Sequence, residues 1–396
     1  MQEQEAERMI AFRQELHRYP ELSCEEQHTA RRIATMLREI GVDEVHEAIG
    51  GHGIVAIIHG HQPGATVGLR ADMDALPLHE ATGLAHGSTH ANVMHACGHD
   101  GHTAMLMGAT LNLVKARPPQ GRVVLVFQPA EELGTGAPSM LEDGLLERFP
   151  MQAIFGLHNW PGVEAGSFVI HDVPHMASSD DFEACFHSEG GHGAMPHLTT
   201  DPIVAAGLFV TAIQQIVSRN VAPEDIAVVS LGCLQSGHAS NIIPASAILK
   251  GTARCFKPDV RHQLERRIRE VAEGVARASG CGVTLDYVPS TPAVVNDADC
   301  ARLCRKVVEE CWGHNRLVTH PISMGADDMG FLLEAIPGAY GWIGNGKGDT
   351  VPDLHQPDYD FNDDILAQGS DFLSNVALRF LDEHHQQPAS TTTTRY

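Results

Sequence analysis

The expected order of strands and helices changes twice along this chain, and these changes constrain its fold most strongly. Towards both ends, apolar segments that predict strands alternate with amphipathic segments that predict helices, which is typical of an α/β domain. Between Asp181 and Val288 the expected order is strand, helix, strand, strand, helix, strand, as in a ferredoxin-like α+β fold. With 396 residues, the chain also exceeds the usual size of a single core. We expect an α/β domain at residues 1–177 and 292–385, interrupted by an inserted α+β domain at residues 178–291.

Two amphipathic helices are expected before the first strand. They cover about Glu3 to His17 and Cys24 to Ile40. Ser23 is a suitable N-cap for the second helix, and Gly41 is suited to end it. At the other end of the chain, the polar residues 386–396 predict a disordered tail.

The charge and the cysteines limit the partners and the compartment. A formal net charge of −23 argues against nucleic acid or an anionic membrane as a partner, since both favour a basic surface. No stretch approaches the roughly 20 apolar residues of a membrane span. The cysteines number nine, an odd count, and are scattered, and the first residues are polar, so we expect a cytoplasmic protein.

The segment from His95 to His102 has the composition of a metal-binding loop. Cys97 and His99 offer a thiolate and an imidazole two residues apart. These donors suit zinc, manganese, cobalt or nickel and are a poor match for magnesium or calcium. Glycine and alanine neighbours favour a loop that leads into a helix from about Gly101, so the ligands are expected at a helix N-terminus.

Adjacent carboxylates follow the most apolar expected strand. Glu131 and Glu132 come just after Arg122–Gln128, and adjacent residues that leave a strand point in different directions. One carboxylate is therefore free to bind metal while the other faces the attacking water. The alternative is a solvated acidic turn, but α/β sheets place their ligands at the carboxyl ends of such strands. His158 ends another expected strand at the same edge.

Short motifs with chemically active residues are spread along the chain. They are Leu69–Pro77, Met94–His102, Phe127–Glu132, Gly156–His158, Gly191–His197, Asn241–Pro244, Gly251–Arg254, Met324–Asp328 and Leu354–Pro357. Together these motifs resemble those of the aminoacylase and carboxypeptidase superfamily of dinuclear metallo-amidohydrolases. The resemblance is greatest to its branch of hippurate hydrolases and indole-acetyl-amino-acid hydrolases. One motif departs from the branch: Met324-Gly-Ala-Asp-Asp-Met329 stands where Met-Gly-Ser-Glu-Asp-Phe is usual.

The resemblance implies a fold and a metal centre. The fold is a mixed-sheet, dinuclear metallopeptidase-like catalytic domain with an inserted ferredoxin-like domain that acts as a lid and in dimerisation. Two divalent metal ions per subunit are implied, of manganese, zinc, cobalt or nickel. Glu131 would be the general base. The implied metal ligands are Cys97, His99, Glu132, His158 and His355.

The resemblance also assigns roles around the metal. His192 would reach the active site of the partner subunit and stabilise the oxyanion, although alone it suggests a surface turn. Asn241 and Arg254 would bind the free carboxylate of the substrate; without the resemblance, a surface salt bridge is as good an interpretation of Arg254. Asp72 and Asp74 would orient a ligand imidazole.

The expected reaction is hydrolysis of the amide bond of N-acyl amino acids, including hippurate-like N-aroyl ones, to a carboxylic acid and a free amino acid. The protein is expected to be a homodimer or a tetramer of dimers. Three alternatives stay open: a carboxypeptidase or dipeptidase acting on small peptides, a non-catalytic metal-binding homologue, and a hydrolase that uses Cys97 as its nucleophile with His99 or His102.

Overall fold

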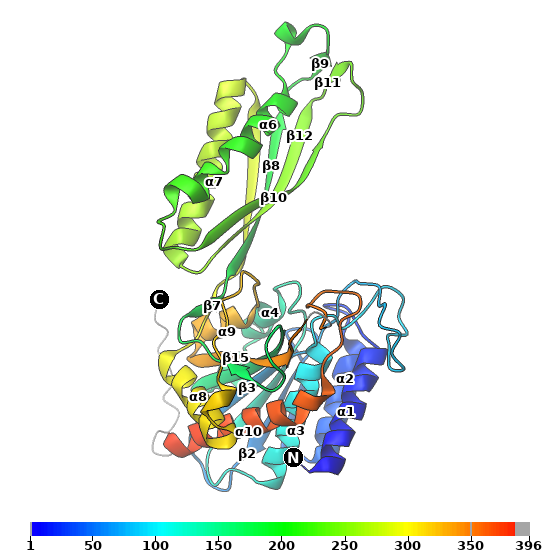
Figure 1. Cartoon of the computed structure of the whole chain (residues 1–396), viewed down its shortest axis with the longest axis vertical. Coiled ribbons are helices and arrows are strands. Elements are labelled where there is room, and N and C mark those ends of the chain that lie inside the picture. Colours follow the sequence, from blue (N-terminus) through cyan, green and yellow to red (C-terminus); the bar gives the residue numbers. More distant parts are fainter. Residues whose placement is uncertain (1, 349–350, 385–396) are drawn as a thin grey trace. The chain divides into compact units, whose positions relative to one another are not determined.

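The computed structural model describes residues 2–348 and 351–384. The expected tail at residues 386–396 lies outside these described residues. The described chain divides into two compact units. The inserted unit consists of Pro174–Val294 and Ile322–Ala326, and the larger unit contains the rest. Both are seen in Figure 1.

The larger unit is built on a seven-stranded mixed sheet with the order β1-β2-β4-β3-β5-β15-β6. Its centre is parallel, since β3 pairs in parallel with β4 and β5, and β5 with β15. The remaining pairs are antiparallel. The strands are β1 (Glu44–Ile49), β2 (Gly53–His59), β3 (Thr66–Asp72), β4 (Arg122–Gln128), β5 (Ala153–Pro161), β6 (Phe168–Val169) and β15 (Gly338–Gly346).

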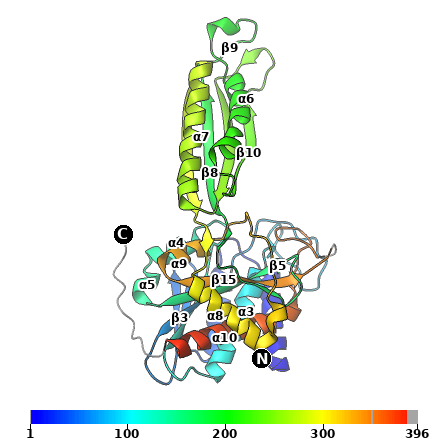
Figure 2. The same cartoon turned by 60° about the vertical axis from the view of Figure 1, so that its left-hand side comes forward.

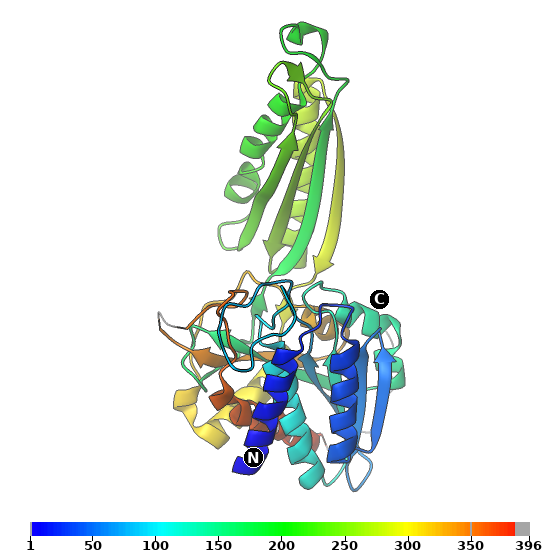
Figure 3. The ribbon, with the colours of Figure 1, turned by 90° about the vertical axis from the view of Figure 1, so that its right-hand side faces the viewer.

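Helices cover both faces of this sheet. The helices of the larger unit are α1 (Glu3–Arg18), α2 (Gln27–Ile40), α3 (His99–Lys115), α4 (Gly136–Glu142), α5 (Leu145–Arg148), α8 (Ala298–Trp312), α9 (Met329–Ala335) and α10 (Leu366–Glu383). The main core joins α1, α2, α3, α8 and α10 to one face through buried apolar side chains. Figure 2 shows α3, α8 and α10 against the sheet, and Figure 3 shows α1 and α2 beside α3. Short 3₁₀ helices are His314–Arg316 and Asp363–Ile365.

Two helix starts differ from the sequence expectation. The second helix begins at Gln27, and its N-cap is Glu26, because the Ser23 hydroxyl donates to Asp74 Oδ2 (2.7 Å) and is not available for capping. Gly41 ends that helix in the left-handed conformation, as expected. The helix expected from Gly101 begins at His99, which places a candidate ligand in its first turn.

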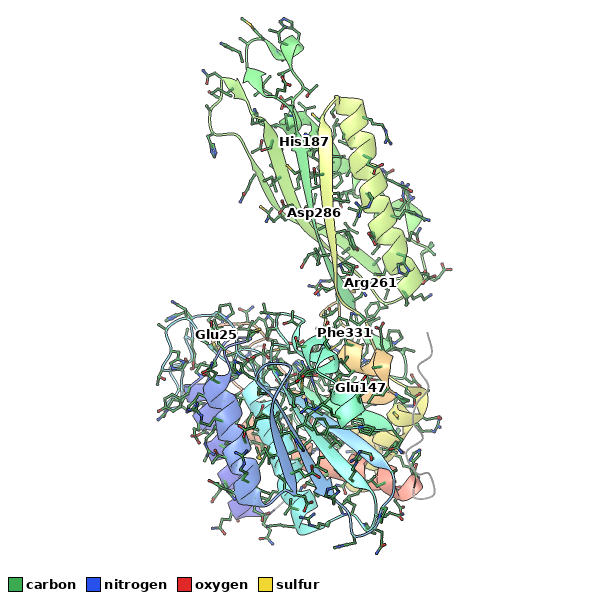
Figure 4. The ribbon with its side chains drawn as sticks, turned by 180° about the vertical axis from the view of Figure 1, so that it is seen from behind. Glu25, Glu147, His187, Arg261, Asp286 and Phe331 are labelled. Carbon is green, nitrogen blue, oxygen red and sulfur yellow. The ribbon has the colours of Figure 1, made fainter. Side chains whose placement is uncertain are left out.

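The inserted unit has the ferredoxin-like order of elements. Its antiparallel sheet has the order β10-β12-β8-β13, and α6 and α7 share one apolar core with it. Near the start of α7, Arg261 pairs through Nε with the buried Asp180 of β8 at 2.9 Å (Figure 4). The main elements are β8 (Ser178–His187), α6 (Pro202–Ala212), β10 (Ala227–Ser236), β12 (Ser246–Cys255), α7 (Pro258–Ser279) and β13 (Gly282–Thr291).

Minor elements complete the inserted unit. The expected helix from residue 201 to 218 ends at Ala212, and a short π-helix follows. The minor elements are the strands β7 (Pro174–Met176), β9 (Gly191–His192) and β11 (Ile242–Ile243), the 3₁₀ helix Pro196–Leu198 and the π-helix Ile216–Asn220; β14 (Val294–Val295) ends one residue beyond this unit. Among the described residues, no helix combines the length and the apolar character needed to cross a bilayer.

Candidate metal centre and active site

The candidate ligands gather where the central parallel strands end. Glu131 and Glu132 follow β4, and His158 lies near the end of β5. His99 stands in the first turn of α3, and His355 comes from a later loop whose backbone N–H donates to Ala96 O (2.8 Å). The carboxyl edge of a parallel sheet is the usual place for a ligand site.

The loop before α3 requires a glycine. Gly98 has a φ of 88°, and a Cβ atom there would lie 2.3 Å from Asn159 Nδ2 and 2.5 Å from Tyr359 Oη. A side chain is therefore excluded both by the backbone conformation and by these neighbours. This close approach places Cys97 and His99 on either side of the turn.

The five ligand candidates form two groups that share one thiol. Cys97, His99 and His158 form one group and Cys97, Glu132 and His355 the other; within each, the ligand atoms lie within 4.8 Å of one another. Cys97 Sγ is 3.5 Å from His158 Nε2, and His355 Nε2 is 3.5 Å from Glu132 Oε1. Cys97 is the one residue that these two groups have in common.

Two of the candidate ligand atoms have no hydrogen-bond partner among the described residues and are therefore available to coordinate a metal ion. They are His99 Nε2 and Glu132 Oε1, and both are buried. An unsatisfied buried polar atom costs roughly 1–3 kcal/mol, and coordination of a cation would remove that cost. Thiolate, imidazole and carboxylate together suit zinc, manganese, cobalt or nickel. The five side chains therefore fit a dinuclear centre.

The protonation of the two buried imidazoles differs. Burial lowers the pKa of His158 well below its ordinary value, so its ring is a neutral donor. Burial also lowers the pKa of His99, but Asp72 and Cys97 outweigh it and raise this pKa well above the ordinary value. A metal ion at His99 Nε2 would therefore displace a proton.

Asp74 ties two candidate ligands together. Its Oδ1 accepts the Nδ1–H of His99 at 3.1 Å, and its Oδ2 accepts the backbone N–H of Glu132 at 3.0 Å. The Ser23 hydroxyl also donates to Oδ2. This arrangement fixes the ring of His99 with Nε2 towards the other ligands.

Asp72 contacts a different imidazole from the one expected. Its Oδ1 accepts the Nδ1–H of His102 at 2.6 Å, and His102 is outside the implied ligand set. The Nε2 atom of His102 accepts the backbone and side-chain N–H groups of Asn159, both at 3.0 Å. Both nitrogens of His102 are therefore used within the protein, which disfavours a metal ion between Asp72, His99 and His102.

Glu131 stands beside the ligands on a constrained turn. Its Oε2 is 3.8 Å from His99 Nε2, and its Oε1 accepts the backbone N–H of Asp328 at 3.4 Å. The preceding Ala130 has a φ of 50°, and its N–H donates to Glu26 Oε1 at 2.8 Å. Burial raises the pKa of Glu131 well above the ordinary value, and neighbouring acids add to this.

Sequence reasoning missed the residues beneath this site. Arg70 is fully buried and bonded to Asp72 and Asp328, and Asn159 holds both His102 and the backbone of Cys97. The arginine within an otherwise apolar strand was the available signal, since a buried arginine needs acidic partners.

The candidate residues of the inserted unit lie at two separate places. His192 is exposed on β9, and the backbone carbonyl of Asn241 accepts the Gly193 N–H at 2.8 Å, so these residues share one end of the unit. Arg254 lies at the far end of β12 and donates to Met324 O at 2.8 Å. The eight residue-to-residue steps from Ser246 to Arg254 span about 26 Å of strand. Within one chain, the structure does not bring Asn241 and Arg254 together.

Known proteins match nearly the whole chain. The family model for peptidase family M20/M25/M40 matches residues 68–379. The hippurate hydrolase of Campylobacter jejuni is 39% identical over 371 residues, which are 93% of this chain and 96% of that protein. The N-acetyl-L-cysteine deacetylase of Bacillus subtilis is 36% identical over 96% of this chain and 90% of its own length. An IAA-amino acid hydrolase of Arabidopsis thaliana is also 36% identical, over 95% of this chain and 85% of its own length.

Solved structures share the fold. The crystal structure of a dinuclear metal-binding M20 peptidase from Bacillus subtilis matches with a TM-score of 0.84 and 32% identity, covering 96% of this chain and 99% of that one. A putative aminohydrolase from methicillin-resistant Staphylococcus aureus matches with a TM-score of 0.89 and 30% identity, covering 96% and 97%. The chain is a member of peptidase family M20/M25/M40.

Proposed function

We propose that this protein is a metal-dependent amidohydrolase that cleaves N-acyl amino acids to a carboxylic acid and a free amino acid. The observation that carries the proposal is the pair of ligand groups sharing Cys97, with the Glu131 carboxylate directly beside them. A pure metal-binding protein has no need of that additional buried acid. The names of the relatives, which include a hippurate hydrolase, a deacetylase of N-acetyl-L-cysteine and an IAA-amino acid hydrolase, support this substrate class.

Glu131 has the role of general base and then of general acid. Bound metal ions would polarise the scissile carbonyl and lower the pKa of the attacking water. Glu131 accepts the proton of that water and passes it to the departing amine nitrogen. The buried position of Glu131 raises its proton affinity, which suits a group that must carry the proton between these two steps. Asp74 keeps His99 and Glu132 oriented throughout.

We propose a homodimer in which each site takes residues from both subunits. His192 and Asn241 share one end of the inserted unit, where β12 begins at Ser246, and Arg254 lies about 26 Å further along β12. If all three contact one small substrate, they must come from different copies of the chain. His192 would stabilise the oxyanion, and Asn241 and Arg254 would bind the free carboxylate of the amino acid.

The surface of the inserted unit is consistent with such a dimer. Ile203, Val204 and Leu208 of α6 are each about half exposed, which is unusual for large apolar side chains. Strand β10 forms one edge of the four-stranded sheet, so its outer backbone groups are open to pairing with another strand. Burial of these groups against a second copy would remove both features from solvent.

We also propose a cytoplasmic location and a set of metals that the site can bind. All nine cysteines are free thiols in the structure, which supports the reducing cytoplasm. The donor set supports manganese, zinc, cobalt or nickel, and reconstitution decides among them.

Two alternative functions, a cysteine-nucleophile hydrolase and a metal-dependent peptidase, predict different responses to inhibitors and substrates. The 3.5 Å approach of Cys97 to His158 is also the arrangement of a cysteine nucleophile and its base. That alternative predicts activity that survives chelation and is lost on thiol alkylation. A carboxypeptidase or dipeptidase would use the same metal centre but would prefer small peptides.

The deciding experiment uses metal-stripped protein and a substrate panel. The panel contains N-benzoylglycine, N-acetyl amino acids and dipeptides, each assayed with and without manganese, zinc, cobalt or nickel, beside the Glu131→Ala variant. We expect metal-restored hydrolysis of the N-acyl amino acids that the variant lacks. Activity without metal would favour the cysteine nucleophile, and preferred cleavage of dipeptides would favour the peptidase. Tight metal binding without any turnover would favour the non-catalytic function.

A further inference from the structure

A buried arginine connects the candidate general base with the metal-binding loop. Arg70 lies in β3, and none of its side chain is exposed. Its Nε donates to Gln128 Oε1 at 2.9 Å, its Nη1 to Asp72 Oδ2 at 2.7 Å and its Nη2 to Asp328 Oδ1 at 2.9 Å. Its Nη1 also donates to Tyr340 Oη at 3.2 Å. A planar guanidinium bonded to Gln128, Asp72 and Asp328 fixes the positions of these three side chains relative to one another.

One branch of this network leads to Glu131. The Asp328 carboxylate is held on both oxygens, by Arg70 and Gln128 on Oδ1 and by the Ala137 backbone N–H on Oδ2 at 2.9 Å. Its own backbone N–H is, among the described residues, the one hydrogen-bond donor to the Glu131 carboxylate. These hydrogen bonds hold the Asp328 side chain in one position. The backbone N–H of Asp328, which donates to Glu131, is therefore held in place as well.

The other branch leads to the ligand loop. Asp72 accepts a hydrogen bond from His102, and His102 accepts two from Asn159. The side-chain amide of Asn159 then donates to the backbone carbonyl of Cys97 at 2.7 Å. Arg70 therefore stands between the shared metal ligand and the general base, and it is linked to both by hydrogen bonds.

Such a network is costly as a device for stability alone. Asp72, Asp327 and Asp328 surround a single cation, and all four groups are almost fully buried. Burying charges costs several kcal/mol per ion, and apolar residues of similar volume often stabilise a protein equally well. A gain in the placement of reacting groups would offset this cost.

We propose that Arg70 and Asp328 are positioning residues for the hydrolytic reaction: they set the place of the Glu131 carboxylate relative to the Cys97 loop and touch no substrate. The inference deepens the proposed function and rests on it for the reaction concerned. Asp328 lies in the Met324–Met329 segment, at a position where this chain keeps the aspartate that is usual in the related branch.

The test compares two matched variants of the full-length, metal-loaded protein. Asp328→Asn weakens the bonds to Arg70 and Gln128, and Asp363→Asn weakens the equivalent bonds to Arg13 Nε and Gln14 Nε2, both at 2.9 Å, away from Glu131. We expect Asp328→Asn to lower kcat on N-benzoylglycine about 10–100-fold, with KM and the number of bound ions unchanged. Asp363→Asn should lower thermal stability and leave kcat unchanged. An equal fall in kcat in both variants, or no fall in Asp328→Asn, overturns the inference.

Two further measurements keep the outcome clear. If Asp328→Asn does not fold, Gln128→Asn shortens one of the clamping side chains, and the same selective fall in kcat is expected. Crystal structures of metal-loaded wild type and variant require no turnover. They should show Glu131 within hydrogen-bond distance of the residue 328 N–H in the wild type and displaced in the variant. An unmoved carboxylate overturns the inference, whereas an inactive wild type would overturn the proposed function alone.

Discussion

The Sγ atom of Cys97 lies 3.5 Å from the Nε2 atom of His158, although 61 positions separate the two residues in the chain. The same thiol belongs to the group formed with Glu132 and His355. The Cys97 thiol is therefore the one candidate ligand atom that both groups have in common. Loss of this atom should affect both metal positions together.

Replacement of Cys97 by serine should reduce metal binding at both positions, because a hydroxyl is a much poorer ligand than a thiolate for these metals. We expect fewer bound ions per subunit by elemental analysis, and loss of hydrolysis. Cys311→Ser is the control, since Cys311 is exposed and lies outside both ligand groups. Full metal content in Cys97→Ser would contradict the prediction that the Cys97 thiol binds metal at both positions.

Gly98→Ala should be far more damaging than Gly41→Ala, although the two glycines have nearly equal φ values of 88° and 89°. An alanine Cβ at position 41 meets no atom within 4 Å, so the change should cost about 1–2 kcal/mol for the left-handed conformation alone. At position 98 the Cβ would meet Asn159 and Tyr359. We expect an additional loss of metal affinity there, measured by calorimetry. Equal effects at the two positions would contradict the packing argument.

The family and the fold class could be predicted from the sequence and are confirmed. The alternation of strands and helices, and the order of elements from β8 to β13, follow from local hydrophobic patterns, which are visible in one sequence. The role of Ser23 could not be predicted, since its hydroxyl bonds to Asp74, a residue 51 positions away. Hydrophobic patterns predict local secondary structure, but they do not predict hydrogen bonds between residues that are distant in the chain.

The buried ion pair next to the candidate site also could not be predicted from local sequence patterns. Arg70 and Asp328 are separated by 258 positions, so nothing local indicates that they form a buried pair. The resemblance to known enzymes implied a set of candidate metal ligands but did not indicate the buried pair of Arg70 and Asp328. The separation of Asn241 from Arg254 along β12 also required the structure, because the sequence gives no distance between the ends of an inserted domain.

Asp74→Asn should weaken metal binding without unfolding the protein. Asp74 accepts hydrogen bonds from His99, Ser23 and the Glu132 N–H, and an asparagine has a single acceptor oxygen for these three donors. We expect metal affinity to fall about 10–100-fold, as is usual when a group that orients a ligand is lost. Ser23→Ala removes one of the three donors and should have a much smaller effect in the same titration.

Glu26 should make stability depend on pH. Burial raises its pKa from 4.5 to about 7, although backbone hydrogen bonds, including that from Ala130, lower it. A raised pKa in the folded state contributes stability that is fully present below about pH 4.5 and is lost as the pH rises through about 7. Relative to Glu26→Gln, the wild type should therefore lose up to about 3 kcal/mol of unfolding free energy over this range.

Urea unfolding of both proteins at about pH 5 and about pH 8 measures this difference. A difference that does not change with pH would show that Glu26 keeps an ordinary pKa in the folded protein.

The most direct test of the central claim is a parallel measurement of bound metal and of turnover in wild type and Glu131→Gln. The account predicts two ions per subunit in both proteins, because Glu131 belongs to neither group that shares Cys97. It predicts hydrolysis of N-acyl amino acids by the metal-loaded wild type alone. Substantial turnover by the metal-loaded Glu131→Gln variant would contradict the account.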